Sequence, residues 1–314
     1  MEISPQGITP SDLDKIQVKD KNNKVIGRVG MLITLYFEDP HNKSLRIAVA
    51  QCIENYYSLL KPHLKLVASE ELGIRKLSNY TLPAIADLVT SLDERDSFEL
   101  MITGANTIKG TSAYNIGTLL NNKRNYKQVG FLTATFPLGF LEQQENGFFQ
   151  QWVHDWCKRL SPYHGYAGLG LVNSIEYGSA RRNAPMLYPL IQRFPGLEID
   201  MPLSHTQHCY ESIKSVNWLT ILSDSFLQQL GGKTILKNQL GDDFPFYDYP
   251  GGTIIQAGLH PQIGDLEKNN IPKHYQQVYR LVQSVQAEYP DIIMDTPEDV
   301  NGLEFTQQWL HRFA

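Results

Sequence analysis

The sequence predicts an α+β fold in which a mixed, largely antiparallel sheet, or more than one such sheet, is covered by helices. The main observation is an order of segments that occurs at three places along the chain. At each place a segment rich in apolar and β-branched residues is followed by a segment with helical periodicity and then by another strand-like segment. This recurrence suggests repeated strand–helix–strand units, although the side chains of the three places differ. No linker rich in Pro, Ser or Gly divides the chain, so we expect one continuous domain.

The predicted strands are short segments of apolar and β-branched side chains bounded by turn residues. In chain order they are residues 25–37, 98–103, 129–136, 165–172, 216–222 and 252–257. The fourth strand alternates glycine with apolar residues, which is typical of a strand that another backbone approaches closely. Pro250, Gly251 and Gly252 precede the last strand. We therefore expect a hairpin turn there rather than a phosphate-binding loop, which would follow a strand and open a helix.

The predicted helices repeat apolar side chains at spacings of three and four residues. In chain order they are residues 45–60, 148–160, 224–230, 272–282 and 305–313. Pro62 closes the first helix and Pro272 opens the fourth, because proline lacks a backbone N–H and fits only at the ends of a helix. Residues 61–96 show no pattern that assigns them to a helix or a strand.

The domain is expected to fill residues 25–314. Residues 1–24 form an N-terminal extension in this prediction, because they end in a charged run over residues 19–24. If the domain divides into two closely packed halves, the boundary falls near residues 177–183.

Length and composition narrow the class of protein. A chain of 314 residues buries enough surface to need neither disulfides nor metals for stability. Its cysteines, Cys52, Cys157 and Cys209, lie far apart, which indicates a reducing compartment and neither a disulfide framework nor a cysteine-based zinc site. The formal net charge is -5, whereas proteins that bind nucleic acid normally carry an excess of basic residues. The charge therefore argues against a nucleic-acid binder. The N-terminal residues do not resemble a secretory signal, and no apolar stretch has membrane-spanning length, so we expect a cytoplasmic protein without a membrane partner.

Linear signatures of catalysis are missing from the sequence. It contains no Gly-x-Ser-x-Gly, no Gly-x-x-x-x-Gly-Lys and no His-Glu-x-x-His. Enzyme families that carry such signatures are therefore disfavoured. We assign no catalytic, cofactor-binding or metal-binding residue from the sequence.

Two weaker patterns support an alternative function, a hydrolase or a metal-dependent enzyme without a linear signature. His205, His208 and Cys209 could offer two imidazoles and a thiolate to a metal, and the simpler interpretation is a surface loop or strand entry. His164 lies between a predicted helix end and a predicted strand, where catalytic histidines occur. A histidine at that position more often caps the last carbonyls of the helix.

A segment of alternating aromatic and acidic residues precedes the predicted hairpin turn. Such a mixture suits a protein-contact surface, because aromatic side chains supply buried contact area and carboxylates complement a basic partner. In a strand, however, aromatic residues usually face the core while the aspartates face water. We predict partner binding by Asp242, Asp243, Phe244, Phe246, Tyr247, Asp248 and Tyr249.

Five parts of the chain, in the same order, resemble the type VI secretion immunity family, which is TsiV-like and was formerly a family of unknown function. These parts are residues 135–141, 161–170, 193–200, the pair of stretches 213–232 and 249–265, and residues 309–313. They are mostly apolar and glycine-rich, so physically they correspond to packed strands and turns. Specificity for a partner is then expected from the exposed residues between them, first of all from residues 241–249.

The resemblance implies a function without catalysis. Members of the family that this chain resembles are encoded beside toxins of the type VI secretion system. They protect the producing cell from its own toxin or from that of its sister cells. Several relatives accompany nuclease toxins, including VRR-type nucleases. We therefore expect a tight one-to-one complex that covers the active site of a cognate toxin acting in the cytoplasm. The resemblance implies no cofactor and no direct binding of nucleic acid, and it leaves the oligomeric state open.

Overall fold

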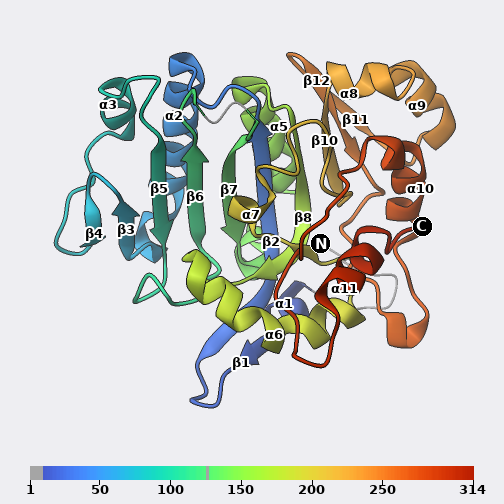
Figure 1. Ribbon diagram of the computed structural model, residues 1–314, viewed down its shortest axis with the longest axis horizontal. Helices are drawn as coiled ribbons and strands as arrows, with labels where there is room; N and C mark the ends of the chain where they lie inside the picture. The colour runs from blue at the N-terminus through green and yellow to red at the C-terminus, as the bar shows by residue number, and fades with distance from the viewer. Residues whose placement is uncertain (1–9, 125–126) are drawn as a thin grey trace.

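The computed structural model describes residues 10–124 and 127–314, and it confirms the α+β prediction (Figure 1). One sheet of twelve strands runs through the described part of the molecule in the order β11-β12-β10-β8-β2-β7-β6-β5-β3-β4, with β1 paired to β2 and β9 to β8. The pairs are antiparallel except β8 with β9. The strands are β1 Gln17–Lys19, β2 Val25–Phe37, β3 Leu66–Ser69, β4 Gly73–Lys76, β5 Phe98–Thr103, β6 Asn115–Leu120, β7 Gly130–Phe136, β8 His164–Val172, β9 Glu198–Ile199, β10 Leu219–Ser223, β11 Phe246–Tyr249 and β12 Gly252–Gln256.

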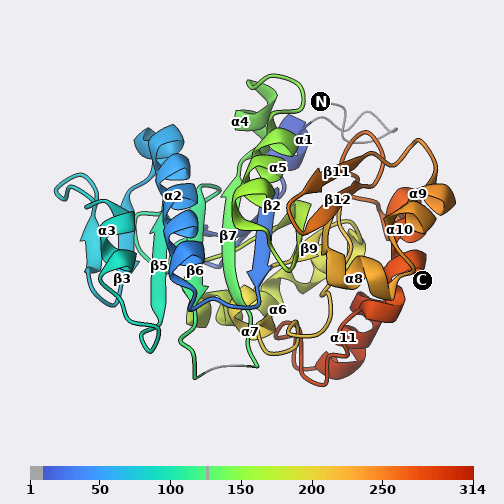
Figure 2. The ribbon, with the colours of Figure 1, turned by 90° about the horizontal axis from the view of Figure 1, so that it is seen from above.

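Helices cover both faces of this sheet. Figures 1 and 2 place α2 and α5 on one face and α6, α7 and α11 on the other. The α-helices are α1 Pro10–Asp14, α2 Lys43–Leu60, α3 Ile85–Thr90, α4 Leu138–Glu142, α5 Phe148–Leu160, α6 Tyr177–Arg193, α7 Pro202–His205, α8 Asp224–Gln229, α9 Lys233–Leu240, α10 Lys273–Val282 and α11 Gly302–Leu310. Short 3-10 turns occupy Lys61–His63, Leu266–Lys268 and Gln283–Val285.

The central strand β2 is apolar along most of its length because it is covered on both faces. Its residues from Met31 to Phe37 are all buried, and it pairs with β7 on one side and β8 on the other. The glycines of β8 allow close packing, as predicted. A Cβ built on Gly170 would lie 2.0 Å from Leu32, and a Cβ on Gly168, whose φ is +154°, would lie 2.0 Å from the Asn217 side chain. Larger residues at either position would displace these neighbours.

Several predicted boundaries differ from the structure for local reasons. The strand expected at 216–222 begins at Leu219, because the Asn217 side chain takes over backbone hydrogen bonds there, accepting from Trp218 N and donating to the Leu169 carbonyl. The terminal helix starts earlier than expected, since the Asn301 side chain caps its first turn. The hairpin turn between β11 and β12 is confirmed, with Gly251 at φ +85°.

The predicted domain limits can be located in the structure. The expected extension, residues 1–24, contains α1 and β1. Its first nine residues, on which the expectation of no secretory signal rested, lie outside the described residues. The predicted boundary near residues 177–183 falls in the first half of α6. The three predicted strand–helix–strand units connect their strands differently. In the described sheet β10 and β12 are neighbours, β7 and β8 flank β2, and β7 and β6 lie between β2 and β5.

Candidate partner-binding surfaces

The predicted partner-binding segment, residues 242–249, forms edge strand β11 and the turn that leads into it. Among the described strands β11 pairs with β12 alone. Phe244 and Tyr249 are buried, and the Tyr249 hydroxyl donates to the Pro162 carbonyl at 3.1 Å. Phe246 and Tyr247 are half-buried. The segment therefore anchors two aromatic rings in the core and presents the other two at the edge of the sheet.

The three aspartates of this segment are exposed, but they differ in their partners. Asp248 binds Lys233 Nζ at 2.7 Å and accepts from Thr253 Oγ1 at 2.8 Å, so it holds the hairpin together. Asp242 and Asp243 make no hydrogen bond or ion pair with the described residues. These two carboxylates are therefore available to a basic partner.

Helix α5 extends this edge surface. His154 Nε2 donates to the Asp248 carbonyl at 2.7 Å, and its ring lies 5.9 Å from the ring of Tyr247. Tyr247 lines a shallow surface hollow together with the polar side of α5, including Gln151 and Asp155. We did not predict this contribution from the sequence. The signal was present in the polar residues that alternate with the apolar stripe of the helix.

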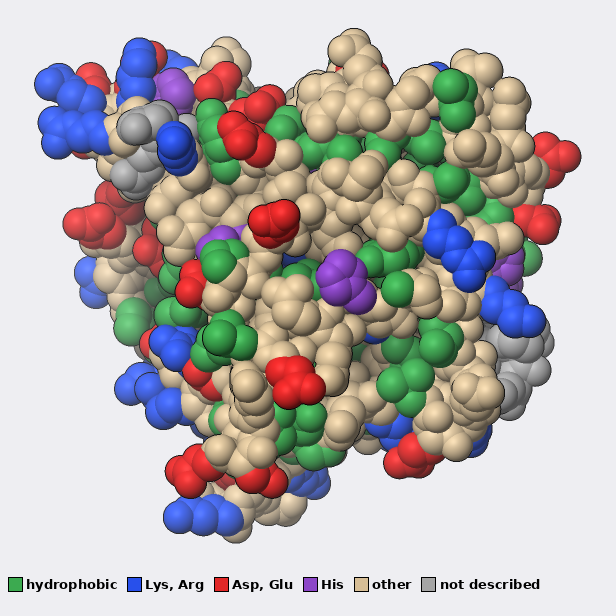
Figure 3. Space-filling model, turned by 45° about the vertical axis from the view of Figure 1, so that its right-hand side comes forward, with side chains coloured by type: hydrophobic (Ala, Val, Ile, Leu, Met, Phe, Trp, Pro, Cys, Tyr) green, Lys and Arg blue, Asp and Glu red, His purple; other side chains and the backbone are tan. Residues whose placement is uncertain are grey.

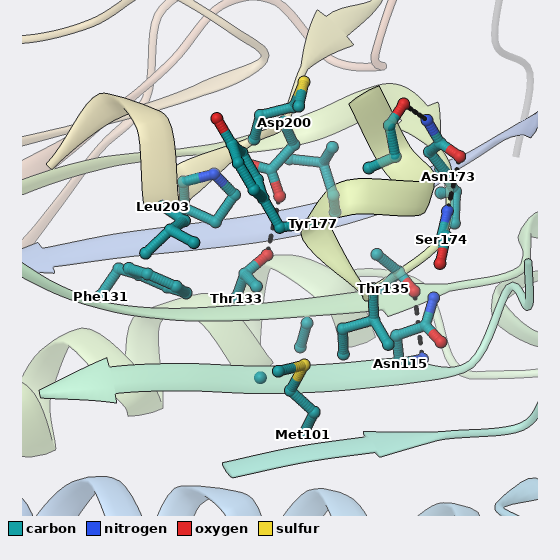
Figure 4. A pocket seen from close by; sticks show the side chains of 18 of the residues that line it. Met101, Asn115, Phe131, Thr133, Thr135, Asn173, Ser174, Tyr177, Asp200 and Leu203 are labelled. Carbon is teal, nitrogen blue, oxygen red and sulfur yellow. Dashed lines mark hydrogen bonds between the residues drawn. The ribbon is translucent and has the colours of Figure 1, made fainter. Parts of the chain in front are cut away.

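A second surface feature is a pocket on the sheet face that carries α6 and α7 (Figure 4). Its cavity volume is about 120 Å³. Strands β5, β6 and β7 form its floor, and the start of α6 and the residues around α7 form its walls. Figure 4 shows Phe131, Thr133, Tyr177, Asp200 and Leu203 at one end of the pocket, with the labelled asparagines, Ser174 and Thr135 at the other.

Asp200 is held in place by hydroxyl groups from three adjacent strands. Thr34 pairs across the sheet with both Thr133 and Tyr166, so the three side chains lie next to one another on one face. Thr34 and Tyr166 donate to Asp200 Oδ1 at 2.9 and 2.8 Å, and Thr133 donates to Oδ2 at 2.8 Å. Burial raises the pKa of Asp200, while Lys214 and these hydrogen bonds act in the opposite direction. The side chain is consequently fixed at the bottom of the pocket.

Behind Asp200 a network of buried charges crosses the molecule. Lys214 and Glu198 are both fully buried, and Lys214 Nζ lies 2.8 Å from Glu198 Oε1. Lys214 also donates to the Tyr166 hydroxyl at 3.3 Å and to the Ile199 carbonyl. Arg312 approaches the other carboxylate oxygen of Glu198 at 3.4 Å. The network thus connects the pocket to the turn that follows the C-terminal helix α11.

The residues of the alternative enzymatic interpretation do not form a site in this structure. His205 lies in α7 and Cys209 in the turn after it, and both are buried rather than placed in a surface loop or strand entry. His208 instead lies beside exposed Asp291 at 3.1 Å. Burial raises the pKa of the Cys209 thiol to about 12, so the thiol is protonated at neutral pH in this structure. No set of three metal-binding side chains was found in the described part of the chain.

His164 is the first residue of β8 and is buried, so the prediction that it caps the preceding helix was wrong. Ser161, with φ +44°, caps that helix instead. The His164 ring stacks on Tyr36 with a centroid separation of 4.7 Å, and its Nε2 donates to the Cys209 carbonyl at 3.0 Å. This arrangement is typical of a packed, neutral core histidine.

Acid should therefore destabilise the fold through His164. Burial lowers its pKa to about 4, although the hydrogen bond to Cys209 acts to raise it. The unfolded chain takes up a proton near pH 6.5, so the stability contributed by neutral His164 is present above that pH and is lost as the pH falls toward 4. We expect a loss of up to about 3 kcal/mol over this range. Urea unfolding at several pH values would measure it; an equal pH slope in His164→Gln would contradict the assignment.

Charges of both signs are interspersed on the face shown in Figure 3, and hydrophobic side chains reach the surface there as small separate groups. None of the described helices has the length and apolar character needed to cross a bilayer. On the visible face, local groups of residues rather than one large charged field must therefore provide any contact specificity.

Comparison with known proteins found a matching sequence family and a solved structure with a similar fold. A family model named TsiV, described as type VI immunity for VRR-NUC, matches residues 48–313. Among solved structures, the Pseudomonas aeruginosa T6SS protein PA0821 is similar with a TM-score of 0.86 and 24% sequence identity, covering 97% of this chain and 88% of that chain. That likeness establishes a common fold. No curated protein sequence matches this chain.

Proposed function

The chain belongs to the TsiV family of type VI immunity proteins, described as conferring immunity to VRR-NUC, and from this premise we propose that it neutralises one cognate nuclease toxin by binding it. The complex would contain one copy of each protein and would cover the active site of the toxin. Because nucleic acid in the cytoplasm is the target of such a toxin, the complex would form there. The family match over residues 48–313 carries this proposal.

Two features of the surface support a binding function. A nuclease must present basic side chains to the phosphates of its substrate. In the edge segment Asp242 and Asp243 have no partner among the residues that the structure describes, and they lie beside the half-buried rings of Phe246 and Tyr247. Unpaired carboxylates next to aromatic contact area are the composition that accelerates association with a basic protein and then stabilises the complex. We propose residues 242–249 as part of the contact.

Co-expression with the adjacent toxin gene tests the proposal. Cells that express the toxin alone should lose viability and show degraded nucleic acid, while cells that also express this chain should grow normally. The purified proteins should elute together from gel filtration at the mass of a one-to-one complex. Unchanged toxicity, together with separate elution of two folded proteins, would reject the proposed function.

A further inference from the structure

We infer that the sheet pocket is the receptor for one basic side chain of the toxin, an arginine or a lysine, whose charged head reaches Asp200. This inference rests on the proposed function, and it names a contact on a different part of the molecule from residues 242–249. The pocket lies over β5, β6 and β7, whereas β11 is the edge strand at the opposite end of the sheet.

The charge of the pocket lining favours a cation. Among the described residues that line it, the charged ones are Glu99 and Asp200, and both are acidic. Glu99 keeps much of its surface exposed, but partial loss of solvent around its carboxyl, and then the nearby carboxylates of Glu70 and Glu71, raise its pKa. A cation that enters there would reduce this repulsion among three carboxylates.

The Asp200 carboxylate is oriented in advance for such a ligand. Its two oxygens accept three hydrogen bonds, from Thr34, Thr133 and Tyr166. A carboxylate can accept about four, so one acceptor position remains. The hydroxyl donors fix the side chain without charge, and Lys214, whose charge favours the ionised carboxylate, donates to the Tyr166 hydroxyl instead. A guanidinium or ammonium head could therefore add a direct charged contact at little cost in side-chain entropy.

The remainder of the pocket suits the aliphatic stem of a long basic side chain. Phe131, Met201 and Leu203 contribute apolar surface near Asp200, and the half-buried ring of Tyr177 forms another wall. Arginine and lysine place their methylene groups along such surfaces while the head seeks a polar partner. The amides at the opposite end are already engaged, since Asn115 and Asn173 each donate one hydrogen bond, to the Ser112 and Ala180 carbonyls respectively.

A small cation tests the pocket without the toxin. Butylguanidinium titrated into the purified chain and followed by calorimetry or NMR shifts should bind with a Kd on the order of millimolar. Asp200→Asn keeps the shape of the side chain, and the neighbouring hydroxyls can reorient to bond it, so this variant should fold while binding the probe at least about tenfold more weakly. Asp299→Asn, which changes an exposed aspartate away from the pocket, should bind the probe like the unmodified chain.

Binding to the toxin itself provides a second test of the inference. Asp200→Asn should weaken toxin binding by about 30-fold or more. Leu203 is 42% exposed, so Leu203→Arg should fold normally and weaken binding as well, because its own guanidinium can occupy the pocket. Toxin affinity unchanged in both folded variants, or absence of probe binding to the unmodified chain, would overturn the inference. Failure of the unmodified chain to bind the toxin would instead reject the proposed function, while the probe titration would still report on the pocket.

Discussion

Replacing Lys214 by alanine should lower the free energy of unfolding by roughly 3–5 kcal/mol, the cost of leaving a buried charge without its partner. Lys214 and Glu198 are fully buried and lie 2.8 Å apart. Without the ammonium group, the one ion-pair partner left to Glu198 among the described residues would be Arg312, whose nearer nitrogen is 3.4 Å away. Urea-induced unfolding followed by tryptophan fluorescence would measure the change, because Trp218 and Trp309 are buried in the native core.

An exposed ion pair gives the matched control for this prediction. Lys233 lies 2.7 Å from Asp248, nearly the same distance, but both side chains are substantially exposed. Lys233→Ala should therefore cost at most about 1 kcal/mol. The double variant Lys214→Met with Glu198→Gln should lose less stability than the sum of its single changes, because it removes both charges together. A loss at Lys214 no larger than that at Lys233 would show that the buried pair does not stabilise the fold.

The sequence predicted the elements whose signals are local. Strands β2 and β5 have the limits expected from their β-branched runs, and α5 has those expected from its apolar stripe. Helix α6 was not predicted, because Pro185 and Pro189 lie inside it and proline usually ends a helix. The short strands β3 and β4 were also not assigned, since the all-exposed β4 carries no alternating apolar pattern.

The pocket and the buried network could not be predicted either, because their residues come together only when the chain folds. Glu198, Lys214 and Arg312 come together from positions up to 114 residues apart, and no periodicity along the chain encodes such a contact. Asp200 ended a segment that we interpreted as scaffold. Thr34, a polar residue within the apolar strand β2, was a usable signal, because a buried hydroxyl requires a partner. The acidic edge segment, by contrast, was visible because its residues are contiguous.

The edge segment should control how fast the toxin is captured. The double variant Asp242→Lys with Asp243→Lys changes the net charge by +4 at two exposed side chains that have no partner among the described residues. Since neither carboxylate supports the fold, the variant should retain its thermal stability. Its association rate with the toxin should fall by about 100-fold at low salt, within the range that electrostatic steering supplies. Stopped-flow fluorescence would measure this rate.

A control variant at another position and the salt dependence of the association rate distinguish electrostatic steering by this segment from a general effect of net charge. Glu298→Lys with Asp299→Lys makes the same change of +4 at another pair of adjacent, exposed acidic residues. If residues 242–249 face the toxin, the first variant should be slowed far more than this control, and the difference should shrink as added salt shortens the range of the interaction. Equal rates for the two variants would assign the effect to net charge and remove the edge segment from the contact. Because the variant leaves Asp248 and the buried rings unchanged, slower capture with an intact hairpin would identify the two free carboxylates as the cause.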